Sequence, residues 1–224
     1  MRFISLLLLV LVLTACSFSS RKADAPQVSG PVSIPASASV SASPVLPDGP
    51  PTPNPYLASV PSVNRAIQQQ FAAAVAAMEQ QQWDQAERIL IDLAHSNPRL
   101  SGIPLNLGLI YRARGDHARA EQAFSQAITA NPQNLDAYNQ LAILKRQQGK
   151  FTEAEQLYQR ALAIWPFHGP SHKNLAILYD LYLGRESDAL AHYLAYQQLT
   201  GEDDKQLTSW IADLQRRVTA AGDQ

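Results

Sequence analysis

The chain has 224 residues, which leaves room for one domain with appended segments. Its 18 basic and 19 acidic residues nearly cancel, so the composition gives no sign of electrostatic attraction to nucleic acid or to anionic lipid. The chain has one cysteine, Cys16, which excludes an intramolecular disulfide.

Residues 1–15 have the features of a secretion signal. Arg2 supplies a positive charge, and the apolar run from Phe3 to Leu13 is too short to span a bilayer as a helix. The run ends in Leu-Thr-Ala-Cys, which resembles the lipobox of bacterial lipoproteins. In that family the peptide is cleaved before the cysteine, so the resemblance predicts a covalent lipid on Cys16. An ordinary signal peptide with an incidental cysteine is the alternative.

The lipobox resemblance also predicts where the protein is held. Several acyl chains on Cys16 would give stable anchoring, which a single chain would not. Ser17 follows the cysteine, in place of the aspartate that often retains lipoproteins in the inner membrane. For a Gram-negative source, the resemblance therefore predicts a protein anchored by lipid in the outer membrane and facing the periplasm.

Residues 16–63 have the composition of a disordered linker. Ten of the fifteen prolines lie between Pro26 and Pro61, among Ser, Ala and Val and without a helical period. Such a segment cannot bury enough apolar surface to offset the entropy of ordering it. We expect a leash that holds the rest of the chain off the membrane. A docking peptide is the alternative, although no motif marks one.

The middle of the chain repeats itself with a fixed period of about 34 residues, the length typical of stacked helix pairs. Residues that share this spacing are Leu107, Gly115, Ala120, Phe124 and Pro132 in one unit, and Leu141, Gly149, Ala154, Tyr158 and Pro166 in the next. Each unit is too small to bury its own apolar face, so the units must stack. The small residues predict close helix contacts, and the glycines predict turns inside each unit.

The order Leu107-Gly108-x2-Tyr111, then Ala120-x3-Phe124-x2-Ala127, then Pro132 resembles the signature of the tetratricopeptide repeat family. The resemblance implies an all-α right-handed superhelix over residues 64–202. We expect about four helix pairs, the first made by Arg65 to Gln81 and Trp83 to His95.

The next two repeats are expected at about 101–134 and 135–168, and the fourth from Gly169. The fourth repeat contains one extra residue, which we place in the turn at 180–185 because an insertion costs least there.

A C-terminal capping helix is expected over residues 203–224. Asp203 is the expected N-cap, with Gln206 three residues on in a capping-box spacing. The residues that share one apolar face are Leu207, Trp210, Ile211, Leu214 and Val218. This face would cover the apolar end of the last repeat; binding of a partner helix is the alternative.

The sequence gives no sign of catalysis. His168 and His172 have a spacing that could hold a metal on a helix, but no third ligand accompanies them, so we interpret them as polar turn residues. His95, His117 and His192 look isolated, and nucleotide-binding and nucleophile motifs are absent. We therefore predict a protein that is not an enzyme, with no metal, no cofactor beyond the lipid on Cys16, no nucleic-acid partner and no small-molecule substrate.

The family resemblance implies a partner-binding groove lined by the first helix of each repeat. The matching residues are Leu105, Leu109 and Arg112 in the second repeat, Asn139, Ile143 and Arg146 in the third, and Lys173, Ile177 and Asp180 in the fourth. They predict an aliphatic strip bordered by cations, with Asn139 available to a partner's backbone. The alternative is that the aliphatic residues only pack between neighbouring helices.

The resulting hypothesis is a periplasmic scaffold or adaptor for an envelope complex. Its partner would be a protein segment, extended or helical, with apolar anchors and acidic flanks. Small repeat lipoproteins are known as pilotins of type IV pilus or secretion secretins and as adaptors for cell-wall hydrolases, so a pilotin-like role is one alternative. A self-associating structural lipoprotein is another.

Overall fold

The structure, a computed structural model, describes residues 46–201 and 204–222. These residues belong to one compact unit, Ser41–Gln224. The predicted signal peptide, Cys16 and most of the predicted linker lie outside the described residues. No helix in the described ranges is long and apolar enough to cross a membrane.

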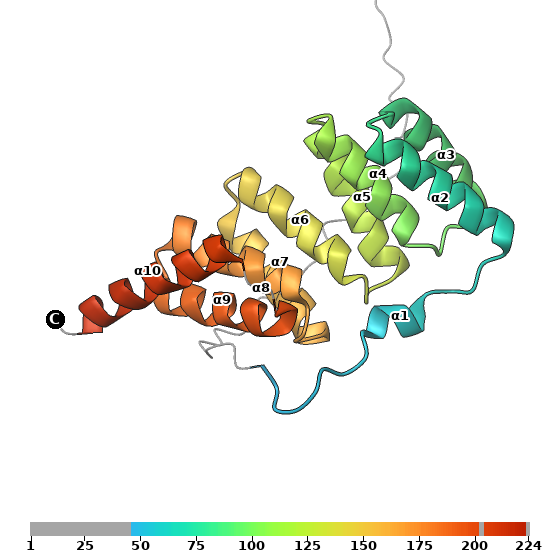
Figure 1. Ribbon diagram of the computed structural model, residues 1–224. Helices are drawn as coiled ribbons and strands as arrows, with labels where there is room; N and C mark the ends of the chain where they lie inside the picture. Colours follow the sequence, from blue (N-terminus) through green and yellow to red (C-terminus); the bar gives the residue numbers. More distant parts are fainter. Residues whose placement is uncertain (1–45, 202–203, 223–224) are drawn as a thin grey trace, which may run out of the picture. The chain divides into compact units, whose positions relative to one another are not determined.

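The described residues form helices without strands, as the period predicts (Figure 1). The four pairs are α2 (Arg65–Glu79) with α3 (Trp83–Ser96), α4 (Gly102–Ala113) with α5 (His117–Ala130), α6 (Leu135–Gln147) with α7 (Phe151–Ile164), and α8 (Gly169–Leu178) with α9 (Glu186–Thr200). Each second helix packs on its own first helix and, in the first three pairs, on the first helix of the next pair. The all-α repeat architecture is therefore confirmed.

The repeated small residues allow the two helices of a pair to approach closely. A Cβ placed on Gly108 would lie 2.5 Å from the ring of Phe124, so only glycine fits between α4 and α5 at this position. Ala120 and Ala154 are fully buried at the corresponding contacts of α5 and α7. Tyr158 is also fully buried and joins the large central core cluster.

The turns inside the pairs share one backbone conformation. Gly115 and Gly149 have φ values of +76° and +75°, in the left-handed region that the glycines predicted. Gln81 stands one repeat period before Gly115 and adopts the same region with φ of 57°. A residue with a Cβ is strained there, so the first repeat keeps the turn at some cost in stability.

The extra residue of the fourth repeat lies in a π-helical turn, η1 (Tyr179–Leu183), that continues α8. The sequence placed it within the turn at 180–185. The position agrees with η1, but the residue is accommodated by a wider helical turn and not by a loop, and Gly184 ends the element in the left-handed conformation.

The helix α10 (Lys205–Gly222) packs against α9 and covers the last pair. Leu207 and Leu214 are fully buried, which confirms the predicted apolar face. The predicted N-cap is wrong by one residue. Oδ1 of Asp204 accepts hydrogen bonds from the backbone N–H of Gln206 at 2.8 Å and of Leu207 at 3.3 Å.

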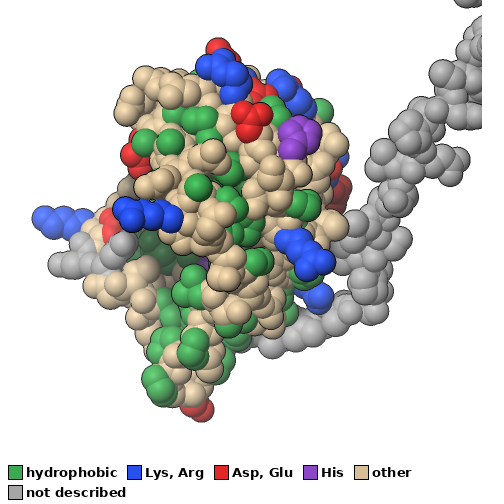
Figure 2. Space-filling view, turned by 90° about the vertical axis from the view of Figure 1, so that its right-hand side faces the viewer, with side chains coloured by type: hydrophobic (Ala, Val, Ile, Leu, Met, Phe, Trp, Pro, Cys, Tyr) green, Lys and Arg blue, Asp and Glu red, His purple; other side chains and the backbone are tan. Residues whose placement is uncertain are grey.

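The described end of the predicted linker, residues 46–63, is named the strap here. It contains a short helix, α1 (Pro55–Ser59), where we expected none. Oδ1 of Asn54 accepts from the N–H of Tyr56, and proline suits the first turn because it needs no donor there. Seen from the α2 end, several hydrophobic side chains gather among polar and backbone atoms in the lower part of the molecule, where Figure 1 places the strap (Figure 2).

Candidate partner-binding groove

The predicted aliphatic strip lies along successive first helices. Leu109 on α4, Ile143 on α6 and Ile177 on α8 are each partly buried and pack against the central core cluster. Leu105 packs there in the same way. Because α4 contacts α6 and α6 contacts α8, these side chains form a row that is supported from behind and still exposed in part.

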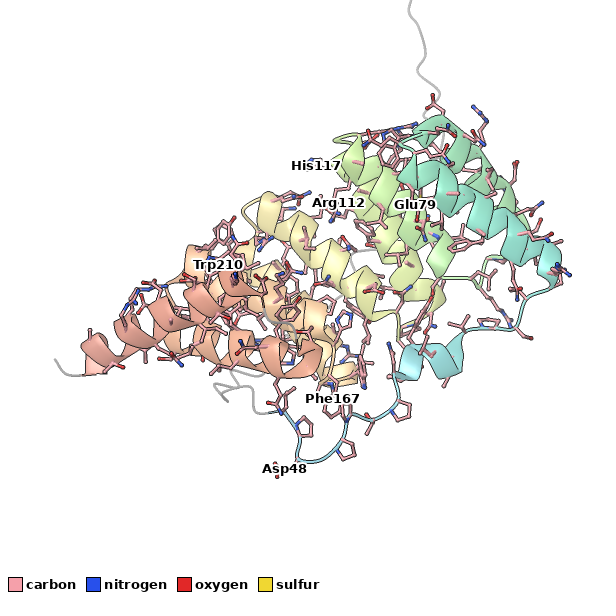
Figure 3. The ribbon with its side chains drawn as sticks, viewed as in Figure 1. Asp48, Glu79, Arg112, His117, Phe167 and Trp210 are labelled. Carbon is pink, nitrogen blue, oxygen red and sulfur yellow. The ribbon has the colours of Figure 1, made fainter. Side chains whose placement is uncertain are left out.

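Arg112 points from α4 toward α6 (Figure 3). Its Nη1 donates a hydrogen bond to Oε1 of Gln140 in the next repeat. Burial lowers the pKa of the Arg112 guanidinium, although the group remains charged at neutral pH. A neutral amide thus partners a partly desolvated cation.

Arg146 occupies the equivalent position on α6, and its guanidinium lies 5.7 Å from the centre of the Tyr182 ring. Its Nη1 is buried and has no hydrogen-bond partner among the described residues, and the same is true of Oη of Tyr158. Burial raises the pKa of Tyr158, while the charges of Arg146 and Arg112 act in the opposite direction. Both arginines therefore lie near the Tyr158 hydroxyl.

Neither Arg112 nor Arg146 forms an ion pair within the described part of the chain. The cation next to Arg146 in the sequence does have carboxylate partners. The Nζ of Lys145, beside Arg146, lies 2.7 Å from Glu121 and 2.9 Å from Glu153. The groove cations are thus an exception among the buried and partly buried cations.

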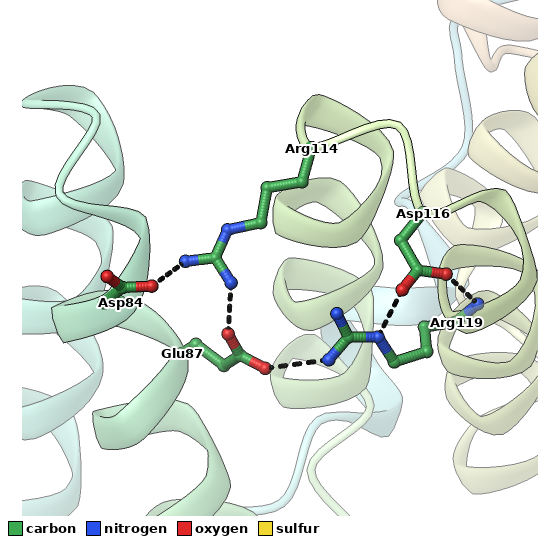
Figure 4. Close-up of polar contacts among 5 residues, drawn as sticks. All are labelled: Asp84, Glu87, Arg114, Asp116 and Arg119. Atoms are coloured by element: carbon green, nitrogen blue, oxygen red, sulfur yellow. Dashed lines mark hydrogen bonds and ion pairs between the residues drawn. The ribbon is translucent and has the colours of Figure 1, made fainter. Parts of the chain in front are cut away.

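A network on another face of the repeats shows the usual arrangement (Figure 4). Arg114 binds both Asp84 and Glu87 of the preceding repeat. Arg119 pairs with Glu87 at 3.4 Å and with Asp116 at 2.5 Å. Hydrogen bonds from Arg119 lower the pKa of the Asp116 carboxyl. Asp84 and Glu87 thereby join the first repeat to the second.

The role predicted for Asn139 is not supported. The side chain is only 3% exposed, and its Oδ1 accepts a hydrogen bond at 3.1 Å from Nδ2 of Asn174 on α8. Asn139 therefore links two repeats and does not present its oxygen to a partner. Lys173 remains partly exposed, with its Nζ 5.0 Å from the centre of the Tyr196 ring.

Asp180 is likewise engaged inside the chain. Its Oδ1 lies 2.7 Å from Nη2 of Arg217 on the capping helix, and Nη1 of Arg217 lies 2.8 Å from Glu186. The carboxylate of Asp180 thus holds α10 against the fourth repeat. Its predicted place on an open groove surface is wrong, because the sequence could not show that α10 would supply a cation there.

Sequence reasoning missed the amides that join the first helices. Gln140 binds Arg112, and Asn174 binds Asn139. Asn106 holds the corresponding position of α4, where its Nδ2 donates to the carbonyl of Gly102 at 2.7 Å. An amide recurs at this position once in every repeat period, and that recurrence is the signal that could have found the set.

Two histidines that looked unrelated form a buried pair between α8 and α9. Nδ1 of His172 lies 2.9 Å from Nδ1 of His192, and Nε2 of His172 lies 2.8 Å from the carbonyl of Pro166. That carbonyl can only accept, so His172 carries its proton on Nε2 and accepts from His192. Burial lowers the pKa of both rings, that of His192 to about 3.

His168 is also buried, and its Nδ1 lies 2.7 Å from Oγ of Ser171. His168 therefore lies at the turn before α8, as predicted, although it is buried. The interpretation of His172 as a turn residue and of His192 as isolated is wrong, because the two form a pair. Within the described ranges, no group of three or more His, Cys, Asp or Glu side chains could hold a metal ion.

A sequence profile of the tetratricopeptide repeat matches residues 71–134, 105–169 and 139–205, which together extend over more than half of the chain. The chain belongs to the tetratricopeptide repeat (TPR) family. Proteins of this family are generally interaction scaffolds and not enzymes, and TPR domains generally bind other proteins. A search among curated proteins gave no match.

Solved TPR-like structures share the fold. PilF of Pseudomonas aeruginosa is 15% identical, with a TM-score of 0.62 over 69% of this chain and 70% of PilF. A MamA structure is 17% identical, with a TM-score of 0.55 over 66% of this chain and 80% of MamA. A TPR protein of Thermus thermophilus is 20% identical, with a TM-score of 0.55 over 68% of this chain and 82% of that one. These likenesses concern the fold alone.

Proposed function

We propose that this TPR protein is a lipid-anchored periplasmic scaffold whose groove binds a segment of an envelope protein. The segment carries apolar side chains for the strip formed by Leu109, Ile143 and Ile177. It carries carboxylates for Arg112 and Arg146. The groove accepts it as an extended strand or a helix, which are the forms that helical grooves commonly bind.

The observation that carries this proposal is the pair of groove arginines without carboxylates. Burying a cation is costly unless an anion or hydrogen-bond acceptors compensate it. Arg112 has one amide oxygen, and Arg146 has a buried Nη1 with no partner among the described residues. A carboxylate from a partner would supply charge-assisted hydrogen bonds to both guanidinium groups.

The strip beside the arginines supports the same conclusion. Partly exposed aliphatic side chains held on a packed core offer a rigid apolar surface, so little entropy is lost when a partner covers them. Charge at the border and apolar contacts at the centre together favour an acidic amphipathic segment over a purely hydrophobic or purely charged one.

The direct test is capture from envelope extracts by the double variant Arg112→Glu, Arg146→Glu. Recovery of the partner is expected to fall roughly thirtyfold or more, since removing one member of a buried charge pair costs about 2 kcal/mol or more. The melting temperature should stay nearly unchanged, because neither arginine has an ion pair to lose in the described part of the chain.

The matched control is Arg88→Glu, Arg160→Glu, which changes the net charge equally at two exposed positions on α3 and α7. It should bind as the natural chain does. Undiminished capture by the folded groove variant would contradict the proposed groove. A stable homomer without a captured protein would favour the self-associating alternative, and recovery of a secretin would favour a pilotin-like role.

The membrane anchor is tested separately. The variant Cys16→Ser cannot receive a lipid on a thiol, so we expect it in the soluble fraction or as an unprocessed precursor. Measuring its distribution between membrane and soluble fractions decides this point. Unchanged processing and membrane retention would contradict the lipobox interpretation and leave the groove proposal intact.

A further inference from the structure

The strap contacts three successive turns between repeats. Oη of Tyr56 accepts from Oγ of Ser101 at 3.4 Å, beside the turn between α3 and α4. Nδ2 of Asn131, between α5 and α6, donates to Oγ of Ser59 at 2.8 Å. Nε1 of Trp165, between α7 and α8, donates to the carbonyl of Thr52 at 3.0 Å. Residues more than one hundred positions apart are thereby joined.

Two of these contacts share the repeat register. Asn131 and Trp165 are one repeat period apart and hold equivalent places in consecutive repeats. Their partners Ser59 and Thr52 are seven residues apart, in the opposite order along the chain. Between these two turns the strap therefore runs antiparallel to the repeats, while Tyr56, the partner of Ser101, lies between Thr52 and Ser59 along the strap.

The Trp165 contact has the chemistry of proline recognition. Thr52 lies in the run Pro50-Pro51-Thr52-Pro53, which favours the polyproline II conformation. That conformation has no internal hydrogen bonds, so its carbonyls are free to accept from a side chain. Trp165 presents an indole N–H from an aromatic corner, with the Phe167 ring centre 6.0 Å away at an interplanar angle of 65°. Aromatic grooves bind proline-rich segments in this manner.

A second contact holds the other end of the strap. Val60 and Val63 join Ile67, Phe71 and Leu100 around a largely apolar cavity of about 270 Å³ between the strap and the first repeats. The strap thus has an apolar attachment at α2 and a polar attachment at Trp165. Figure 3 labels Phe167, close to Trp165 in sequence, and Asp48 of the strap in the lower part of the view.

We propose that the turn between α7 and α8 is a binding site for a proline-rich segment, with Trp165 as its hydrogen-bond donor. Its occupant is residues 50–55 of the same chain. A segment of this composition buries too little apolar surface to adopt one conformation alone, so we infer that its contact with the repeats fixes its conformation. The site shares no residue with the groove and does not depend on the proposed function.

The first test uses chymotrypsin on the mature chain, with mass spectrometry to follow cleavage after Tyr56 and Leu57. Trp165→Phe keeps an aromatic ring and removes the N–H donor. We expect its cleavage to be about fivefold faster, as loss of one hydrogen bond implies. Trp83→Phe, at the start of α3, is the matched control and should be cleaved like the natural chain. Equal cleavage of all three proteins would overturn the site.

The second test asks for proline. In the full chain carrying Pro51→Gly and Pro53→Gly, a peptide with the natural sequence of residues 46–59 should bind and shift the tryptophan emission. A peptide with glycine in place of these prolines should bind at least roughly tenfold more weakly. Equal binding of both peptides would overturn proline recognition. Protection of the natural strap that grows with protein concentration would overturn its assignment to the same chain.

Discussion

Arg112 on α4 and Arg114 just after it differ in whether the described part of the chain supplies a carboxylate partner. Arg114 is held by Asp84 and Glu87 of the preceding repeat, whereas Arg112, two residues earlier, has only the amide oxygen of Gln140. The same contrast recurs on α6 between Lys145, which has two glutamates, and Arg146, which has none among the described residues. Of these four cations, Arg114 and Lys145 have carboxylate partners within the described residues, and Arg112 and Arg146, on the predicted groove, have none.

The largest effect comes from destroying the scaffold that both sets of cations share. Leu107→Asp places a charge at a position only 8% exposed between α4 and its neighbours, so it should cost about 4 kcal/mol or more and unfold the second repeat. Thermal unfolding followed by circular dichroism measures this. Leu57→Asp on α1, at 72% exposure, is the control and should have little effect. A stable Leu107→Asp protein would contradict the assigned core.

The buried pair of His172 and His192 is a third case, because these titratable groups are buried without a carboxylate partner among the described residues and stay neutral. The folded-state pKa is lowered, so their contribution to stability is complete above the unfolded pKa of about 6.5. It is lost as the pH falls from 6.5 toward the folded value of about 3. Between pH 7 and pH 5 the free energy of unfolding should drop by about 2 kcal/mol.

Denaturant unfolding at several pH values tests this dependence. His95→Gln changes an exposed histidine and should leave it intact. In His192→Asn the dependence should shrink, because the more strongly shifted ring is gone. A pH dependence that persists unchanged in His192→Asn would show that other groups cause it.

A smaller effect compares the two arginines directly. Arg114→Gln removes contacts to two carboxylates at a partly exposed site and should lower the free energy of unfolding by up to about 1 kcal/mol. Arg112→Gln removes a desolvated charge and should leave stability unchanged or slightly higher. Urea titrations of the two variants measure the difference. The opposite order would mean that Arg112, too, is a structural residue.

The smallest effect concerns the strained turn of the first repeat. Gln81→Gly relieves a positive φ at the position that Gly115 and Gly149 fill in later repeats. It should raise the free energy of unfolding by about 0.5–1 kcal/mol. Gln82→Gly, next to it with φ of −81°, is the control and should not stabilise the chain. A loss of stability in Gln81→Gly would contradict the assigned turn.

The sequence predicted what depends on local order. Phe124 and Tyr158 are one repeat period apart, as are Gly115 and Gly149, so the helix pairs and their core could be read directly. The contacts that it missed join distant segments. The pair Asp180–Arg217 depends on how the capping helix docks, and the pair Trp165–Thr52 joins the repeats to a segment with no helical period. The residue pattern of a single repeat cannot predict contacts between segments that are far apart in the sequence.

The central claim is that the partner binds on the side of Arg112 and Arg146. Photo-crosslinking in cells tests it most directly, with a photoreactive phenylalanine derivative placed at Ile143 in the strip or at exposed Arg160 on α7. We predict a covalent adduct with one envelope protein from position 143 and none from position 160. An adduct from position 160 with none from position 143 would contradict the claim and place the binding surface on the second helices.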